Sequence, residues 1–446
     1  MRWVALSLLF ILFALPLPAK AQGYGYIRDT EIEQSMNEWF TPILRAAGLS
    51  TKSVNIILVN SPEVNAFVAG GNNVFIYTGL LMKTDSVGEV IGVFAHELGH
   101  VTGGHLIRTR EAATRAQGAA LVSTLVGFGA AILGGGDAAV AAMSTGQAFA
   151  TSTYLAHSRI QESSADQAAI SYIQDAELDP EGFRTFLGKL ENQELLPASQ
   201  QVEYVRTHPI TRNRIENVST RIERTASKDK PYPKEWQEQH RRMKAKLIGF
   251  INPDRVYNVY PEADTSMAAR YARVIAAYKK NNFSRAHDIM DTMLSEEPQN
   301  PYFLELLGQI YRDEGKLDLA VENFEKAVKF SEDSAMIKMA LAHVLLESSK
   351  DEAATREAIK YLKEAVVLEP RTSFLYRLLA TAYGRLGQDG QAQLYLAEEG
   401  VIRGDLDYAR RQAEIAAKEV EPNSPEKIRA EDLLLYIKQE QAREMN

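Results

Sequence analysis

The sequence contains no cysteine among its 446 residues. This absence excludes disulfide bonds, thiolate metal ligands, cysteine nucleophiles and thioether lipid anchors together. Any bound metal must therefore be held by histidine, aspartate or glutamate. The sequence also lacks a basic stripe, and its formal net charge is -8. Because nucleic-acid binding requires a positive surface, we expect no nucleic-acid partner and favour a protein or peptide ligand.

The first 21 residues have the pattern of an export signal. Arg2 supplies the basic start, residues 3–18 form an apolar run, and Ala19 to Ala21 match a small-residue cleavage site. The run is short for a membrane span. We therefore expect cleavage after Ala21 and a mature chain outside the cytoplasm, with an uncleaved anchor as the alternative.

The length of 446 residues exceeds one ordinary hydrophobic core, so two folded domains are expected. Residues 228–262 combine prolines with many charged side chains, which is typical of a linker or bridging segment. This places one domain at residues 22–227 and a second at residues 263–446, after a signal peptide at residues 1–21.

The first domain begins with mixed secondary-structure patterns. Apolar spacing predicts a helix over residues 31–47, strand-like runs follow at residues 54–59 and 74–77, and a turn is indicated at residues 70–73. An amphipathic helix is predicted over residues 86–107. The coarse expectation is a small sheet with a hairpin, followed by helices.

Three residues of this helix carry the strongest chemical signal. His96 and His100 stand one helical turn apart, so both imidazoles lie on one face and can share a metal ion. Glu97 lies at the edge of that face, where it can take a proton from an activated water. Neutral imidazole ligands with one open coordination position fit zinc best, and we expect one Zn²⁺ per chain.

A second acidic pair follows on another predicted helix. Glu162 can complete a His₂Glu site, which is the ligand set of a catalytic rather than a structural zinc. Asp166, one turn further on, can accept a hydrogen bond from a ligand imidazole and fix its tautomer. The alternative is an exposed acidic helix face with surface salt bridges.

Between the two motifs lies an unusual stretch. Residues 116–156 carry a single charge, at Asp137, and are rich in alanine, glycine and serine. A pair of tightly packed helices, a mobile lid and a hairpin in peripheral contact with a membrane are all consistent with this composition. A membrane-spanning hairpin is less consistent, because the side chains are small and weakly hydrophobic.

The second domain repeats itself from about Met267. Taking Pro301 as the first position of a 34-residue unit places Leu304, Leu307, Gly308, Tyr311, Ala320, Phe324 and Ala327 on the packing positions of a tetratricopeptide repeat. Neighbouring units keep Ala286, Ala342, Ala380 and Ala392. Stacked repeats of this kind build a concave surface for protein partners.

Four blocks resemble the signature blocks of the gluzincin peptidases of the HtpX and CAAX-prenyl-protease type. These blocks are residues 96–100, Glu162 to Asp166, Asn65 to Phe67 before Gly70 and Gly71, and Thr207 to Pro209 with Arg214 and Ile215. With the signal peptide and the repeats, the architecture resembles BepA-like periplasmic metalloproteases of Gram-negative bacteria. The resemblance implies Glu162 as third zinc ligand, a periplasmic location, and a role in quality control and assembly of outer-membrane proteins.

The resemblance also gives a role to His208. In the BepA-like group a histidine in the matching block can approach the zinc, where it would occupy the water's position and hold the enzyme latent. In other members the block is associated with substrate or oxyanion binding, and a simple loop role is the alternative. Arg214 is expected to pair with Asp166 or with a substrate carbonyl, or to form a structural salt bridge. Asn65 is expected beside the substrate.

The strand at Val74 to Thr78 is predicted to be an edge strand near the metal. Val74, Phe75 and Ile76 would then pair with an extended substrate and present its scissile bond. This arrangement favours unfolded or misassembled proteins as substrates over small peptides of fixed sequence.

The sequence thus predicts an α+β gluzincin-type metalloprotease domain, a small sheet plus helices, followed by an all-α tetratricopeptide-repeat solenoid. The predicted function is zinc-dependent hydrolysis of peptide bonds in unfolded or misassembled envelope proteins, with the repeats binding substrate or the outer-membrane assembly machinery. The main alternative is a chaperone or assembly factor that binds through its repeats and rarely cleaves. A membrane-anchored maturase of lipidated peptides is a third interpretation, which requires a true membrane span.

Overall fold

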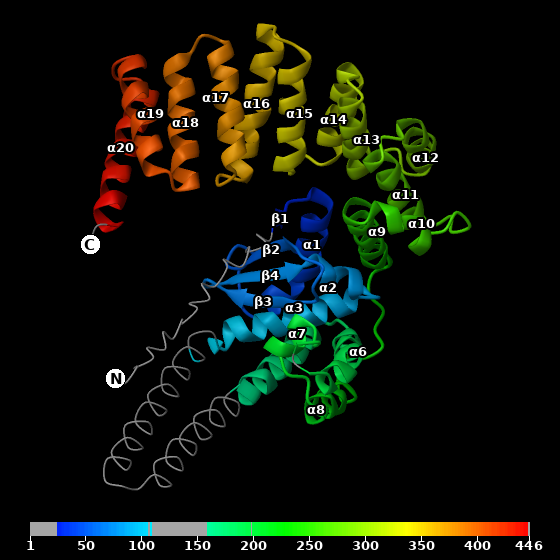
Figure 1. Ribbon diagram of the computed structural model, residues 1–446. Helices are drawn as coiled ribbons and strands as arrows, with labels where there is room; N and C mark the ends of the chain where they lie inside the picture. The colour runs from blue at the N-terminus through cyan, green and yellow to red at the C-terminus, as the bar shows by residue number, and fades with distance from the viewer. Residues whose placement is uncertain (1–24, 106–107, 109–157, 198, 445–446) are drawn as a thin grey trace, which may run out of the picture.

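The computed structural model describes residues 25–105, 108, 158–197 and 199–444 (Figure 1). The expected signal peptide, residues 1–21, and the uncharged stretch, residues 116–156, lie outside the described residues. Among the described residues, none of the helices combines the length and apolarity that a membrane crossing requires.

A four-stranded sheet forms the centre of the N-terminal region. Its strands are β1 (Gly25–Ile27), β2 (Asn55–Asn60), β3 (Ala66–Ala69) and β4 (Asn73–Tyr77), in the order β1-β2-β4-β3. β3 and β4 form the antiparallel hairpin, whereas β2 and β4 run parallel. Gly70 and Gly71, with φ of 58° and 94°, make the predicted turn, since a side chain is strained in that conformation.

The register of the sheet corrects one prediction. β4 is bonded to β2 on one side and to β3 on the other, so it is an inner strand and cannot pair with a substrate. Val74 and Ile76 are buried in the core, at 0% and 2% exposure. An apolar run fits an inner strand as well as an edge strand, so the sequence alone did not distinguish the two. The edge strands are β1 and β3, and β3 is the one that neighbours β4.

Helices α1 (Thr30–Ala46), α2 (Thr78–Lys83) and α3 (Val87–Thr102) pack against this sheet. Asp29 and Ser86 cap α1 and α3 by accepting hydrogen bonds from backbone N–H groups of their first turns. The rings of Phe40 and Phe94 stack with centroids 3.8 Å apart and join α1 to α3. α3 ends before the predicted residue 107, because Gly104 adopts a φ of 61°.

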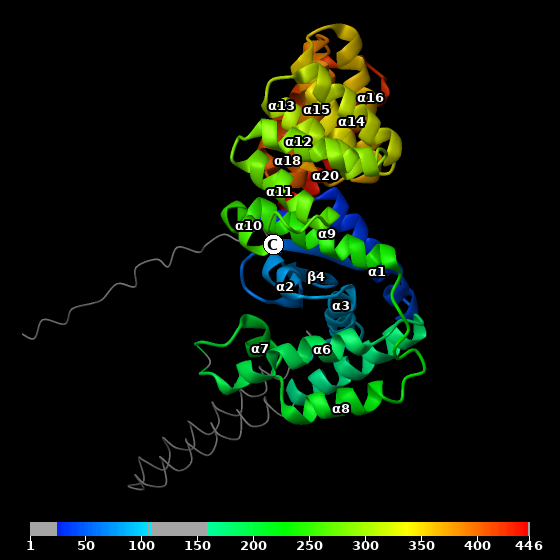
Figure 2. The same ribbon diagram turned by 90° about the vertical axis from the view of Figure 1, so that its right-hand side faces the viewer.

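The next helices cover the side of α3 that faces away from the sheet. Residues 158–175 are helical, followed by α6 (Glu181–Leu190), the 3-10 helix η1 (Glu191–Leu195), α7 (Glu203–Thr207) and α8 (Arg212–Ile222). Figures 1 and 2 show α3 between the sheet and this helical layer. α3 is consequently buried on almost every face, from Val87 to Gly99.

The C-terminal region is an all-helical solenoid, arranged as an arc of antiparallel helix pairs (Figure 1). Its helices are α11 (Met267–Lys279), α12 (Phe283–Glu296), α13 (Pro301–Asp313), α14 (Leu317–Phe330), α15 (Ala335–Ser348), α16 (Glu352–Leu368), α17 (Ser373–Arg385), α18 (Asp389–Arg403), α19 (Leu406–Glu419) and α20 (Pro425–Glu444). The predicted packing positions are buried, including Leu304, Gly308, Ala320, Phe324 and Ala327. A side chain at Gly308 would meet the Phe324 ring at 2.9 Å, which explains the small residue there. The predicted fold class is confirmed.

The proline-rich segment contains a packed helix, α9 (Lys234–Ile251), with the short η2 (Pro253–Arg255) and α10 (Val256–Val259) after it. Trp236 and Met243 of α9 join the core of the N-terminal region, whereas Ala245 packs against α11. α9 therefore lies between the two regions, as both views show (Figures 1 and 2).

A buried group of charges fixes this junction. Glu31 of α1, at 0% exposure, accepts hydrogen bonds from Arg242 and Lys246 of α9 at 2.9 and 3.3 Å. It also accepts one from the Tyr271 hydroxyl of α11 at 2.9 Å. Removing one partner of such a buried group typically costs about 3–5 kcal/mol, because the other charge is left uncompensated.

Glu305 of α13 lies beside this group, and its titration should make the free energy of unfolding depend on pH. Burial, together with Asp29 and Glu31, raises the pKa of Glu305 to about 7 against the opposing effect of Lys246. An acid whose folded-state pKa is raised stabilises the fold at low pH, and this contribution is lost as the pH rises through the folded-state value.

We therefore expect Glu305→Gln to raise the thermal unfolding midpoint relative to wild type more at about pH 8.5 than at about pH 5. The difference should correspond to roughly 2–3 kcal/mol. Glu322→Gln, at an exposed position of α14, is the control and should show no such pH dependence. An equal effect of Glu305→Gln at both pH values would contradict the burial argument.

Candidate metal centre

The metal-binding motif lies at the most buried part of α3. His96 and Glu97 are 0% and 1% exposed. The i,i+4 spacing brings the Nε2 atoms of His96 and His100 to 3.1 Å from each other, as the sequence predicts. Phe183 of α6 stacks on the His96 imidazole, with centroids 5.6 Å apart, and holds the ring in place.

Two further side chains converge on these nitrogens. Glu162, from the helix at residues 158–175, places its carboxylate oxygens 3.4 Å from the Nε2 atoms of both histidines. His208, which follows α7, places Nδ1 3.2 Å from Glu162 Oε1 and 3.4 Å from His96 Nε2. One ligand atom from each of the four residues lies within 4.8 Å of all the others.

This donor set fits a metal ion. Three imidazole nitrogens and one carboxylate, all aimed at one point inside the protein, are borderline donors of the kind that zinc prefers. Asp166 and Glu162 raise the pKa of His96 to about 9 against the effect of burial. A cation in the cluster would take the place of that proton, because imidazole ligates metals in its neutral form.

The Nδ1 atoms of His96 and His100, which face away from the ligand cluster, also contact other side chains. Asp166 Oδ1 lies 3.0 Å from His96 Nδ1, and His105 Nδ1 lies 3.0 Å from His100 Nδ1. Such contacts fix the orientation of ligand imidazoles. Asp166 thus stands where the sequence suggested, and His105 contacts His100 directly.

The short distance between α3 and the helix at residues 158–175 places Glu162 in the cluster. A Cβ on Gly99 would lie 2.9 Å from both the Cα and the carbonyl oxygen of Ala165. Only glycine therefore permits this crossing, one turn from Glu162 and directly before His100.

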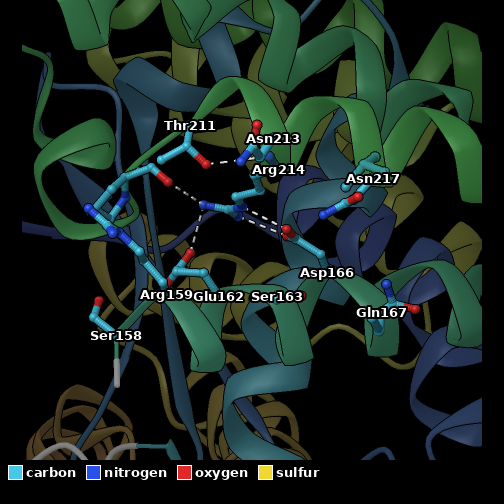
Figure 3. A pocket seen from close by; sticks show the side chains of 12 residues that line it. Ser158, Arg159, Glu162, Ser163, Asp166, Gln167, Thr211, Asn213, Arg214 and Asn217 are labelled. Atoms are coloured by element: carbon cyan, nitrogen blue, oxygen red, sulfur yellow. Dashed lines mark hydrogen bonds and ion pairs between the residues drawn. The ribbon is translucent and has the colours of Figure 1, made fainter. Parts of the chain in front are cut away.

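Arg214 of α8 completes the ionic network (Figure 3). Its Nε lies 2.6 Å from Asp166 Oδ2, and its Nη1 lies 2.7 Å from Glu162 Oε2. Burial acts to raise the pKa of Asp166, but the charge of Arg214 holds it below its ordinary value. A cavity of about 200 Å³ opens beside these three residues, lined also by Arg159 and Asn213.

Glu97 differs from the other carboxylates of the site. Neither of its oxygens accepts a hydrogen bond, and the nearest ring nitrogen, His208 Nε2, is 3.5 Å away. Burial raises the pKa of Glu97, more than the charges of His208 and His96 lower it. A buried carboxylate that accepts no hydrogen bond and has a raised pKa is suited to accept and release a proton.

Asn65 lies where β3 begins and is buried, at 1% exposure. Its carbonyl oxygen accepts the Tyr77 N–H at 3.0 Å, and its side chain is 3.5 Å from the Thr207 hydroxyl. It therefore ties β3 to the segment that carries His208. Of the other predicted substrate contacts, Phe75 lies on the inner strand β4 with Val74 and Ile76, so that part of the prediction was wrong.

Sequence reasoning missed Tyr204. It is 0% exposed, its ring lies 4.7 Å from the His208 ring, and its hydroxyl has no hydrogen-bond partner. The only signal in the sequence is its position one helical turn before His208, which does not distinguish it from an ordinary core aromatic.

Comparison with known proteins finds a family match for the N-terminal region and another for the C-terminal region. Residues 27–222 match peptidase family M48, and residues 270–413 match the tetratricopeptide repeat. The chain is 26% identical over 392 residues to the "Beta-barrel assembly-enhancing protease" of Yersinia pestis, covering 86% of this chain and 78% of the relative. The protein of the same name from Escherichia coli (strain K12) is 25% identical over 425 residues, covering 94% and 85%. "Metalloprotease LoiP" of Escherichia coli (strain K12) is 28% identical over 188 residues, covering 41% and 69%.

The crossing at Gly99 can be tested directly. Gly99→Ala should force the helix at residues 158–175 away from α3, weaken metal binding and lower stability by roughly 1–3 kcal/mol, as overpacking usually does. Chelator competition and thermal unfolding of the metal-free protein measure the two effects. Gly188→Ala is the control: it is an exposed helix position with nothing within 4 Å, where alanine should stabilise by about 0.5–1 kcal/mol. Unchanged metal affinity in Gly99→Ala would contradict the argument.

Proposed function

We propose that this chain, a metalloprotease with a peptidase family M48 domain and tetratricopeptide repeats, is a zinc endopeptidase that cleaves extended segments of unfolded or misassembled envelope proteins. The observation that carries the proposal is the convergence of His96, His100, Glu162 and His208 beside the unpartnered carboxylate of Glu97.

His96, His100 and Glu162 would hold one zinc ion per chain. Zinc bound there supplies a Lewis acid that polarises the scissile carbonyl and promotes ionisation of water. Asp166 and His105 orient the two imidazoles, and Arg214 holds Asp166 and Glu162 in position. The neutralising contact from Arg214 also keeps two buried carboxylates close together without repulsion.

Glu97 is the proposed general base. It would accept the proton of the attacking water as the C–O bond forms and deliver it to the amide nitrogen as the C–N bond breaks. Its burial supports this role, because the resulting raised pKa brings the carboxylate closer to the pH at which it must exchange protons.

Strand β3 is the proposed substrate-binding edge. The Tyr77 N–H bonds to the Asn65 carbonyl, and in an antiparallel pair the bonded residues alternate. The backbone groups of Ala66 and Val68 therefore point away from β4, and no strand of the described residues pairs with that edge. An extended substrate can add there as a further strand, which favours unfolded segments.

His208 would hold the resting enzyme latent. Its Nδ1 lies within the ligand cluster, while its Nε2 faces Glu97 Oε1 at 3.5 Å. A side chain in that position would take the place of the water that must lie between a bound metal and the base. Its displacement, by substrate or by a partner, would then switch the enzyme on.

The cellular setting is inferred from the relatives. The printed name "Beta-barrel assembly-enhancing protease" supports a role in outer-membrane protein assembly, and together with the expected signal peptide it supports a periplasmic location. The repeats would bind substrates or the assembly machinery. Residues 116–156 remain a candidate for peripheral membrane contact.

A second candidate function is that of a chaperone or assembly factor with little proteolysis. The position of His208 in the ligand cluster favours it, because an enzyme blocked in this way would act mainly through its repeats. The two functions differ in their dependence on Glu97. Cellular function that survives Glu97→Gln but not disruption of the repeats would support the chaperone.

The direct test is cleavage of an unfolded model protein by the purified mature chain, with bound zinc quantified in every variant. Glu97→Gln should retain zinc and lose about 10²–10⁴-fold in rate, since it removes the general base. His208→Ala should retain zinc and cleave faster than wild type. Wild-type activity in Glu97→Gln would exclude the mechanism, and a slower His208→Ala would exclude latency.

A further inference from the structure

The hydroxyl of Tyr204 poses a question that the proposed mechanism leaves open. A buried hydroxyl without a hydrogen bond typically costs about 1–3 kcal/mol of stability. The Tyr204 side chain is 0% exposed and its hydroxyl has no acceptor. Phenylalanine would fill the same space without this cost. The presence of the hydroxyl therefore needs an explanation other than packing.

The position of Tyr204 is fixed from several sides. Its backbone N–H donates to the Val64 carbonyl at 3.0 Å, which ties α7 to the segment before β3. Its carbonyl accepts the N–H of His208 at 2.7 Å. Its ring packs edge-on against Phe186, with centroids 5.4 Å apart, and also contacts the His208 ring. The hydroxyl therefore cannot turn away without disturbing the core.

The charged groups around the hydroxyl belong to the catalytic cluster. Burial raises the pKa of Tyr204 well above its usual range, and the charge of Glu97 is the next contribution, followed by those of Arg214, Glu162 and Asp166. The Tyr204 ring lies 4.7 Å from the His208 ring, and His208 Nε2 lies 3.5 Å from Glu97 Oε1, so Tyr204 packs directly behind the residue that contacts the proposed base.

The other donors of the site are committed. Arg214 donates to Asp166 through Nε and Nη2, and to the Pro209 carbonyl through Nη1, which also contacts Glu162. His96 Nδ1 faces Asp166, and His208 Nδ1 faces the ligand cluster. His96 Nδ1 makes no hydrogen bond of good geometry but faces Asp166 Oδ1 at 3.0 Å, so among the described side chains around the cluster the Tyr204 hydroxyl is the buried donor that faces no acceptor.

Peptide hydrolysis requires such a donor. As water adds to the scissile carbonyl, negative charge develops on the carbonyl oxygen, and a pre-positioned hydrogen bond stabilises it. We propose that the Tyr204 hydroxyl donates this hydrogen bond and is a catalytic residue beside Glu97. The proposal rests on the proposed peptidase function and assigns to it a residue that binds the substrate oxygen.

The test is Tyr204→Phe, which keeps the ring and removes only the hydroxyl. The turnover number should fall by about 10²-fold, the loss typical of one oxyanion donor, with little change in KM. The acidic limb of the pH-rate profile should stay in place, since Glu97 is unaltered. The metal-free variant should unfold at the same temperature as metal-free wild type or higher, because no hydrogen bond is lost.

Tyr232→Phe is the matched control. Its hydroxyl donates to the Asp179 carbonyl at 2.6 Å, away from the cluster. This variant should lose thermal stability and keep its turnover number within about twofold. The control thus separates loss of an ordinary structural hydroxyl from loss of a catalytic one.

Full activity in Tyr204→Phe, while Glu97→Gln is inactive, would overturn this inference and leave the proposed function standing. A shifted acidic limb would also overturn it, because the hydroxyl would then act through Glu97. If Glu97→Gln is itself fully active, the proposed function fails, and the role of Tyr204 fails with it.

Discussion

The contact of Gly99 with the backbone of Ala165 is the constraint on which the catalytic region depends. Two histidines on one helix supply only part of a metal site, and the remaining ligand must come from another element. The absence of a side chain at Gly99 brings that element close enough for Glu162 to face both imidazoles. Because α3 is already buried against the sheet and α6, it cannot shift to accommodate a larger residue.

The same close packing explains the chemistry of the carboxylates. All are removed from water, yet Glu162 and Asp166 form close contacts with Arg214 and with imidazoles, whereas Glu97 accepts no hydrogen bond and has only the His208 ring at 3.5 Å. Pairing keeps the first two ionised, as ligands and supports must be. Burial raises the pKa of Glu97, and the lack of a hydrogen bond leaves its oxygens available. The different surroundings of the three carboxylates therefore suit Glu162 and Asp166 to hold a metal and its ligands, and Glu97 to exchange protons.

The elements that local spacing determines were predictable from sequence. The i,i+4 pairs on α3 and on the helix at residues 158–175, and the small residues of the repeats, follow directly from helix geometry. Sheet order was not predictable, because apolar runs such as β4 fit an inner or an edge strand equally well. The buried cluster of Glu31, Lys246 and Tyr271 could not be predicted either, since only tertiary packing brings these distant segments together.

We propose that three histidines and one glutamate of this chain share a metal ion, one of the histidines being the displaceable His208. X-ray absorption at the zinc edge, on wild type and on His208→Ala, measures this coordination. We expect one zinc per chain with three imidazoles and a carboxylate in wild type, and the loss of one imidazole with zinc retained in the variant. Absence of zinc, or identical coordination in both proteins, would contradict it.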